Sequence, residues 1–388
     1  MSEWKECTIA DLGEVVGGAT PSTKKPENYE NGDISWITPK DLSTFRGRYI
    51  LRGERNITEI GLNSCSTRLL PPNTVLFSSR APIGYVAIAA KEMCTNQGFK
   101  SVIPNTDTDF MFLYYLLKYN RDNIENMGSG TTFKEVSGNT MKSIKVCVPV
   151  DIDEQRRIGA VLSAIDDKIE LNTAINENLE QQAQALFKNL IADVQERVPF
   201  TSVIQVLGGG TPKTGKQEYW NGEIPFFTPK DVGTPYVLTT EKNITPLGLV
   251  NCNSRLYPVN TVFLTARGTV GKVSLAGVPM SMNQSCYALA GKDGLHQIIV
   301  YHYVLETVKA LKHKASGAVF DAIITRDFDT ESVPALSSEQ IDSFIAVAEP
   351  IYSDILNRTI ENQRLAALRD TLLPKLMNGE IDVSEVKI

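Results

Sequence analysis

The sequence predicts an α/β protein in which two similar mixed α/β modules alternate with two long helices. Three observations predict it. Most of the 388 residues form an internal repeat, each copy contains short β-like runs, and a long apolar heptad pattern follows each copy. The expected segments are a first module at 1–150, a first long helix at 151–194, a second module at 195–335 and a second long helix at 336–388.

The internal repeat is visible in matching strings that keep the same order in both copies. "GGATPSTKK" at 17–25 matches "GGGTPKTGK" at 208–216, and "NGDISWITPKD" at 31–41 matches "NGEIPFFTPKD" at 221–231. The segment 57–84 matches 244–271 in the same way. The offset drifts by only a few residues, as short loop insertions would cause. Two similar modules in tandem predict two similar tasks and a pseudo-twofold order along the chain.

Each module is predicted to combine short strands with one helix packed on a sheet. Runs such as "ISWIT", "TVLFSS" and "SIKVCVPV" are rich in β-branched and aromatic residues and are separated by Gly, Pro and Asn. The segments 110–120 and 298–313 are apolar enough for a buried helix. This pattern predicts a mixed α/β fold for each copy.

The segments after the modules predict long helices that pair with each other as an antiparallel coiled coil. No Gly or Pro occurs from Ala160 to Val194, and apolar residues alternate by four and three. Asn176 and Asn362 occupy equivalent seam positions and are predicted to fix the register; alternatively, one of them faces solvent. Arg358 and Arg369 also fall on the seam, and Pro350 predicts a kink or a restart.

Composition argues against several classes of protein. No run of about 18 apolar residues occurs, so no membrane helix is expected. Six cysteines without a C-x-x-C pair and only three histidines make a metal site improbable and predict reduced thiols and a cytoplasmic location. The net charge of −6 excludes a chain that is basic throughout but not a local basic face.

One stretch has the spacing of a phosphate-binding loop, but its context argues against a nucleotide site. "GTPKTGK" at 210–216 is followed by Gln217, where such a loop needs Ser or Thr. The matching string in the first module lacks the second Gly. We therefore interpret the stretch as a Gly-Thr-Pro turn that marks the start of each module. No catalytic motif is evident, and intrinsic enzymatic activity is not expected.

The chain resembles the specificity subunits of type I restriction–modification systems. The resemblance covers essentially the whole sequence and rests on "GGATPST", "ITPKDL", "RAPIG" and "TNQG" in the first module, their second copies, and "RDTLLPKLMNGEIDV" at 369–383. It implies that each module is a target recognition domain for one half of a split double-stranded DNA sequence. It also implies that the helices set the spacing and dock the modification subunits and, through them, the restriction subunits. No cofactor is expected on this chain, because S-adenosylmethionine belongs to the modification subunit. The alternative is a non-catalytic scaffold whose paired modules bind a protein or another ligand.

Residues that are identical in both copies are expected to hold DNA phosphates or the fold rather than to distinguish two half-sites. This set comprises Thr38, Lys40, Asp41, Thr228, Lys230 and Asp231. The alternative is a Pro-containing turn that its own Asp caps. Amides suited to adenine are supplied by Asn96, Gln97, Asn283 and Gln284, which are also typical of turns.

Arginines and divergent loops complete the predicted DNA-binding set. Arg80 and Arg267 follow a strand and precede a Gly loop, where each is expected to reach a guanine or a phosphate, or else to form a structural ion pair. Arg46 and Arg48 lie in a segment where the copies diverge, which predicts either a DNA-contacting face or a solvated strand face. The remaining candidates are the loop residues Ser129, Gly130, Ser316 and Gly317.

Overall fold

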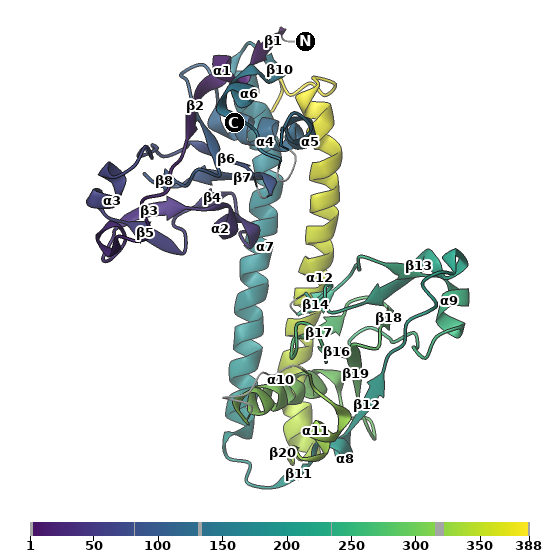
Figure 1. Ribbon diagram of the computed structural model, residues 1–388. Coiled ribbons are helices and arrows are strands. Elements are labelled where there is room, and N and C mark those ends of the chain that lie inside the picture. The colour runs from purple at the N-terminus through teal and green to yellow at the C-terminus, as the bar shows by residue number, and fades with distance from the viewer. Residues whose placement is uncertain (1–2, 81, 131–133, 234, 315–321, 387–388) are drawn as a thin grey trace. The chain divides into compact units, whose positions relative to one another are not determined.

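The computed structural model describes residues 3–80, 82–130, 134–233, 235–314 and 322–386, and it divides into two compact units (Figure 1). Unit 1 comprises Met1–Glu170 and Arg364–Ile388, and unit 2 comprises Leu171–Gln363. Each unit therefore holds one module together with parts of both long helices. No described helix is long and apolar enough to cross a membrane.

Unit 1 contains a two-stranded, a three-stranded and a five-stranded sheet. The strand orders are β1-β10, β5-β3-β8 and β2-β9-β6-β7-β4. The strands are β1 (Trp4–Thr8), β2 (Gly13–Gly17), β3 (Ile34–Ile37), β4 (Tyr49–Ile50), β5 (Arg55–Ile57), β6 (Val75–Ser79), β7 (Ile83–Ala89), β8 (Cys94–Thr95), β9 (Lys100–Pro104) and β10 (Lys145–Pro149). The short helices are α1 (Ile9–Leu12), η1 (Pro26–Asn28), α2 (Pro39–Ser43), α3 (Glu59–Asn63), α4 (Phe110–Tyr119), α5 (Arg121–Asn126) and α6 (Gly138–Ser143).

Unit 2 repeats this arrangement strand for strand, which confirms the predicted pair of mixed α/β modules. Its sheets have the orders β11-β20, β15-β13-β18 and β12-β19-β16-β17-β14. The strands are β11 (Arg197–Pro199), β12 (Ile204–Gly208), β13 (Trp220–Phe227), β14 (Tyr236–Val237), β15 (Asn243–Ile244), β16 (Val262–Thr265), β17 (Val273–Ala276), β18 (Ser281–Met282), β19 (Cys286–Gly291) and β20 (Ser332–Pro334). The short helices are α8 (Phe200–Val203), η2 (Gln217–Tyr219), α9 (Pro246–Val250), α10 (Gln297–Lys314) and α11 (Thr325–Asp329).

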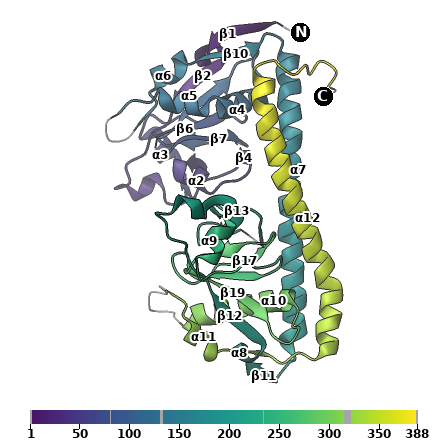
Figure 2. The same cartoon turned by 90° about the vertical axis from the view of Figure 1, so that its right-hand side faces the viewer.

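Each module is anchored by one buried helix that lies beside its five-stranded sheet and a long helix. In unit 1, Asp109 caps α4 by accepting a hydrogen bond from the N–H of Phe112 at 2.9 Å, and six consecutive residues of α4 are buried. In unit 2, α10 is buried in the same way against the sheet that contains β16 and β19 (Figure 2). Burial of most of α4 and of the first part of α10 explains why these stretches lack a helical polar face, whereas the last residues of α10 include exposed Lys and His side chains.

The two long helices are α7 (Ile152–Ala192) and α12 (Ser338–Met377). Within unit 2, Asn172 donates to Asn362 Oδ1 at 2.9 Å, and Asn176 donates to Thr359 Oγ1 at 3.3 Å. As the residue number on α7 rises from 172 to 176, the residue number of the partner on α12 falls from 362 to 359. The two helices therefore run antiparallel there, as predicted. Asn176 and Asn362 both make hydrogen bonds across the seam, which supports their proposed role in fixing the register.

Two residues that disturb the sequence pattern have local explanations. Arg369 lies on the seam because it pairs with Asp166 of α7, at 2.6 Å between Nη1 and Oδ1. The predicted restart at Pro350 is wrong, because α12 runs through this residue as one helix. Pro350 is exposed, so its ring faces water, and the carbonyl that loses its partner is on the outer side of the helix.

The core of unit 2 contains a buried histidine that is expected to make this unit acid-sensitive. Burial lowers the pKa of His302 from 6.5 to about 3. A histidine whose folded pKa is depressed contributes stability above its unfolded pKa and loses it as the pH falls. We expect unfolding free energy to fall between pH 6.5 and 3, by up to about 1.4 kcal/mol per pH unit from this group.

Urea unfolding between pH 7 and pH 4 tests this expectation. His302→Phe removes the titrating group while keeping an aromatic ring, so the pH slope of the unfolding free energy should become flatter. His313→Gln is the matched control, because His313 is exposed and its replacement should leave the slope unchanged. An equal slope for His302→Phe and the unaltered chain would contradict the assignment.

Candidate nucleic-acid interface

The Gly-Thr-Pro turn after the first strand of each large sheet is held by a close backbone approach. A Cβ on Gly18 would lie 2.2 Å from the carbonyl oxygens of Thr95 and Asn96, and a Cβ on Gly209 would lie 2.1 Å from that of Asn283. Only glycine fits at such a distance. The next threonine in each turn then hydrogen-bonds to a glutamine, in the pairs Thr20–Gln97 and Thr211–Gln284. The stretch that has phosphate-loop spacing therefore packs against, and hydrogen-bonds to, the Asn-Gln segment of its own module.

Replacing the second glycine of the turn is expected to disrupt one module at a time. Gly18→Ala should lower the melting temperature of unit 1 and abolish any activity of the first module, because backbone oxygens cannot yield to the added methyl group. Gly17→Ala is the matched control, since a Cβ there meets nothing within 4 Å. In unit 2 the corresponding pair is Gly209→Ala and Gly208→Ala. Calorimetry measures the difference, and equal melting temperatures for Gly17→Ala and Gly18→Ala would refute it.

The Thr-Pro-Lys-Asp turn is a capping box that uses its aspartate internally. In module 1, Asp41 accepts from the N–H and the hydroxyl of Thr38, both at 2.7 Å, and from the N–H of Glu54 at 2.7 Å. Asp231 makes the corresponding bonds to Thr228 and Glu241. Because both carboxylate oxygens are engaged, we assign Asp41 and Asp231 to holding the turn rather than to contacting DNA.

The lysines of the same turns point into solvent. The side chains of Lys40 and Lys230 are 78% and 79% exposed. Each is paired with a glutamate, Lys40 with Glu54 at 2.7 Å and Lys230 with Glu241 at 3.5 Å. Exposed pairs of this kind contribute little to stability, so a phosphate can replace the glutamate at small cost.

The Asn-Gln turn lies directly beside the capping box. The N–H of Asn96 donates to the carbonyl of Ile37 at 2.9 Å, and its Oδ1 accepts from the N–H of Gly98 at 2.9 Å. Asn283 makes the equivalent bonds to Phe227 and Ser285. In both modules the Oδ1 atom of the asparagine therefore stabilises the turn, as the turn interpretation expects.

The two candidate arginines lie at the same edge. Ser79, which precedes Arg80, donates its N–H to the carbonyl of Gly98 at 2.7 Å. In module 2, the N–H of Arg267 donates to Ser285 at 3.2 Å. Arg80 lies 3.8 Å from Glu135 between Nη1 and Oε2, whereas Arg267 is exposed. The carboxyl ends of β3, β6 and β8 therefore bring three turns together, with Thr38, Lys40, Arg80, Asn96 and Gln97 side by side in sequence-distant loops.

The loop with Ser129 and Gly130 reaches this edge through Glu135. Ser129 and Glu135 exchange backbone hydrogen bonds at 3.1 and 2.9 Å, and Arg80 pairs with Glu135 both in a β-bridge and through its side chain. The equivalent candidates in module 2, Ser316 and Gly317, lie outside the described residues. We name the edge formed by the capping box, the Asn-Gln turn and the arginine the turn cluster; it occurs once in each module.

Comparison with known proteins identifies the family. Residues 1–181 and 195–344 match the type I restriction modification DNA specificity domain. This chain belongs to that family. It is 32% identical to the specificity subunit of the type I restriction enzyme MjaIX from Methanocaldococcus jannaschii, over 99% of this chain and 95% of the relative.

More distant members of the specificity family agree in extent and fold. The HindI specificity subunit from Haemophilus influenzae is 23% identical over 98% of this chain and 100% of the relative. The crystal structure of a type I restriction-modification S subunit from M. genitalium superposes with a TM-score of 0.61 at 16% identity, covering 97% of this chain and 96% of that one. At this identity the likeness shows a shared fold.

For this member of the specificity family, Arg48 must be withdrawn from the DNA-contacting set. Its side chain is only 5% exposed, and its guanidinium pairs with Asp167 and Glu170 of α7, the latter at 3.2 Å from Nε to Oε1. Its partners lie on a long helix more than a hundred residues away, which the local pattern of arginines could not reveal. Arg46 is exposed and stays a candidate.

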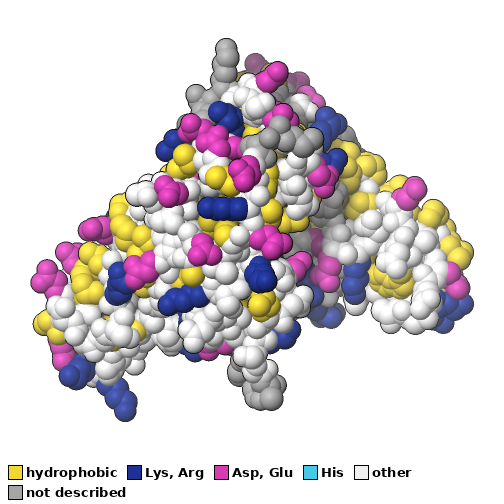
Figure 3. All heavy atoms as spheres, turned by 90° about the horizontal axis from the view of Figure 1, so that it is seen from above, with side chains coloured by type: hydrophobic (Ala, Val, Ile, Leu, Met, Phe, Trp, Pro, Cys, Tyr) yellow, Lys and Arg dark blue, Asp and Glu magenta, His cyan; other side chains and the backbone are white. Residues whose placement is uncertain are grey.

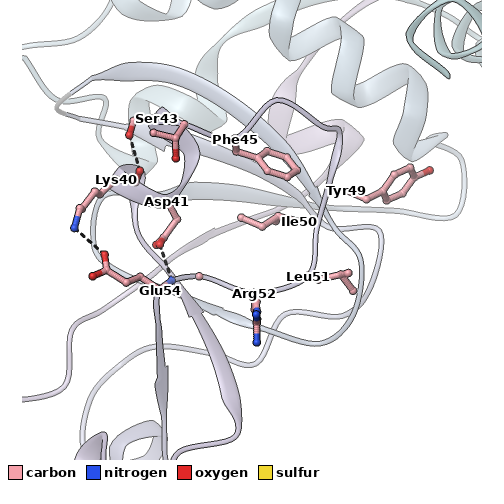
Figure 4. A pocket seen from close by; sticks show the side chains of 11 residues that line it. Lys40, Asp41, Ser43, Phe45, Tyr49, Ile50, Leu51, Arg52 and Glu54 are labelled. Atoms are coloured by element: carbon pink, nitrogen blue, oxygen red, sulfur yellow. Dashed lines mark hydrogen bonds and ion pairs between the residues drawn. The ribbon is translucent and has the colours of Figure 1, made fainter. Parts of the chain in front are cut away.

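Sequence reasoning also missed a hollow beside the capping box. In unit 1 it has a volume of ≈ 550 Å³, with Lys40, Phe45, Tyr49, Leu51 and Arg52 among the lining residues (Figure 4). In unit 2 a hollow of ≈ 300 Å³ is lined by Tyr236, Val237, Leu238 and Thr239 in the equivalent segment. The hollows differ in charge, because the position of Arg52 is taken by Thr239. The one signal in the sequence was that the copies diverge here.

Charge on the molecular surface is mixed. On the face shown in Figure 3, Lys and Arg side chains are interspersed with Asp and Glu rather than gathered in one broad basic patch. A net charge of −6 agrees with this. Contact with a polyanion would therefore depend on local groups such as the lysines and arginines of the turn cluster.

Proposed function

We propose that this chain is the non-catalytic specificity subunit of a type I restriction–modification complex. In this role it recognises a split double-stranded DNA target and directs the modification and restriction subunits to it. Membership of the specificity family supports the proposal, and it does not favour the alternative of a general scaffold. A DNA target also agrees with a cytoplasmic site of action.

The observation that carries the proposal is the repetition of the turn cluster. Each module places a capped lysine turn, an Asn-Gln turn and an arginine at the carboxyl ends of equivalent strands. The residues shared by both copies suit phosphates, while the adjacent hollows differ in sequence and charge. Two modules with a common anchoring device and different neighbouring surfaces fit two different half-sites.

The proposed DNA-contacting set keeps the sequence candidates except Arg48, Asp41 and Asp231, whose charged groups are engaged within their units. In module 1 it comprises Thr38, Lys40, Arg46, Arg80, Asn96, Gln97, Ser129 and Gly130. In module 2 it comprises Thr228, Lys230, Arg267, Asn283, Gln284, Ser316 and Gly317. Phosphates are the expected ligands of the lysines, and the arginines are the strongest candidates for guanine edges.

Mapping of methylated positions in a host with and without this chain tests the function. The expected result is one split methylated sequence that depends on the chain. Footprinting of the complex with its modification subunits should show two protected blocks and binding that weakens steeply as salt rises. A complex that shows no preference among duplexes of different sequence would overturn the proposal.

A further inference from the structure

In each unit one cluster joins the buried helix of the module, α4 or α10, to both long helices. The two clusters, here called junctions, occupy equivalent positions of the repeat. Junction 1, in unit 1, consists of Tyr115 of α4, Asp166 of α7 and Arg369 of α12. Aligning the repeats places three residues of unit 2 at the same positions, which together form junction 2: His302 of α10, Tyr352 of α12 and Ala183 of α7. The two junctions occupy the same positions in the repeat, but their side chains differ in charge and polarity.

Junction 1 is a hydrogen-bonded charge cluster. Tyr115 Oη donates to Asp166 Oδ2 at 2.6 Å, and Arg369 Nη1 donates to Asp166 Oδ1 at 2.6 Å. The side chain of Asp166 is 8% exposed, and Tyr115 is fully buried. Both oxygens of the carboxylate are engaged, and the arginine compensates its charge. Removing Arg369 would leave the carboxylate charge of Asp166 uncompensated with little access to water.

A second ion pair holds the same module to α7. Arg48, just before β4, is buried against Asp167 and Glu170, which lie one and four residues beyond Asp166 along the helix. Module 1 is thus attached through two of its own elements to one acidic stretch of α7. In unit 2 the three corresponding positions hold no acidic residue, because Tyr352, Ser353 and Leu356 stand there. The nearby Asp354 pairs with Arg358 of its own helix.

The three residues of junction 2 are uncharged, and the carboxylate beside them, Glu180 of α7, accepts a hydrogen bond from Tyr301 at 2.8 Å. His302 Nε2 and Tyr352 Oη lie 3.1 Å apart, and the ring of Phe187 stacks on the imidazole with centroids 4.6 Å apart. Ala183 and Tyr352 are buried in the same apolar cluster. Pro235, the counterpart of Arg48, carries no charge. His302, Tyr352, Phe187 and Pro235 would offer no positive charge to a carboxylate placed among them.

We infer that the residues of each junction are complementary only to each other. Module 1 therefore packs stably only on its own part of α7 and α12, and module 2 only on the other part. A module 1 placed against Tyr352 and Leu356 would bury Arg48 without a carboxylate. A module 2 placed against Asp166 would leave that carboxylate without the hydroxyl of Tyr115. The residues of the junctions are positioning residues that set how each module is seated. The consequence for DNA, a fixed order of the two half-sites, rests on the function proposed above.

Transplanting junction 2 into unit 1 of the full chain tests the inference. Asp166→Tyr alone should lower the melting temperature of unit 1 by at least about 6 °C, because it removes the buried carboxylate that pairs with Arg369 and that accepts the hydroxyl of the fully buried Tyr115. In the complex with modification subunits, protection of one half-site should be lost and the other kept. The triple variant Tyr115→His, Asp166→Tyr, Arg369→Ala should recover at least half of the melting shift and restore the protection.

Two further variants keep the test decisive. Ala164→Tyr adds the same side chain at an exposed position of α7 and should leave melting and protection unchanged. In unit 2, Tyr352→Asp should affect the other half-site, and adding His302→Tyr with Ala183→Arg should rescue it.

The inference is overturned if Asp166→Tyr is tolerated or if the triple variant is no better than the single one. It is also overturned if melting recovers while protection does not. A failure of the unaltered complex to protect any DNA would contradict the proposed function instead, and the melting comparison would still decide the complementarity of the junctions.

Discussion

Arg80→Ala is expected to weaken recognition of one half of the DNA target, and Arg267→Ala to weaken the other half. Loss of one arginine contact to a base edge costs about 1–3 kcal/mol, which corresponds to roughly 5- to 150-fold in affinity. The ion pair between Arg80 and Glu135 is long, at 3.8 Å, and about a third of the arginine side chain is exposed. Breaking this ion pair so that Arg80 can contact DNA therefore costs little free energy.

The measurement is a half-site footprint of the complex, combined with competition by duplexes altered in one half. Arg68→Ala is the control, because Arg68 is also exposed and paired with an acid, Glu14, outside the turn cluster. It should leave both halves protected. If Arg80→Ala and Arg267→Ala weakened the same half, the assignment of one module to one half-site would be wrong.

The fold was predictable because the heptad pattern of the long helices and the matching strings of the modules are local in sequence and occur twice. The heptads of the long helices lie within a single segment, and the strings around Gly18 and Gly209 occur twice in the same order. A repeated string with the same spacing must have the same structural reason in both copies. The structure supplies it as the close approach of each glycine to a neighbouring backbone.

The candidate site was predictable only in part, because side-chain partners come from distant segments. Arg48 and Arg46 look alike in sequence, yet the first is buried against α7 and the second is exposed. The contact between Thr20 and Gln97 was within reach, since Thr211 and Gln284 recur at the matching places. A pair of polar residues that recurs in both copies would have indicated it.

The partners of seam residues show the same limit. Sequence periodicity placed Arg369 on the apolar seam of α12, which looked like a misfit. Its partner Asp166 lies on the other long helix, and the two charges neutralise each other beside Tyr115. Periodicity predicts which face of a helix is covered, but not which polar groups on the covering element compensate a charge on that face.

Lengthening both long helices by one turn is expected to change the spacing of the target and nothing else. Because α7 and α12 each cross the boundary between the units, four residues added between Glu170 and Leu171 and four between Gln363 and Arg364 leave every contact within a unit unchanged. Four helical residues add about 6 Å. Since base pairs stack about 3.4 Å apart, the preferred spacer should grow by one or two base pairs.

Methylation mapping of the lengthened chain measures this change directly. Both half-sites should keep their sequence, because no residue of either module is altered, while the original target should lose its methylation. Replacing the exposed residues Leu171 and Arg364 beside the insertion points with alanine, without changing length, is the control and should preserve the original spacer. A chain that kept the original spacer after the paired insertions would show that the helices do not set the spacing. A changed half-site sequence would contradict the expectation that the paired insertions leave the base contacts of both modules unaltered.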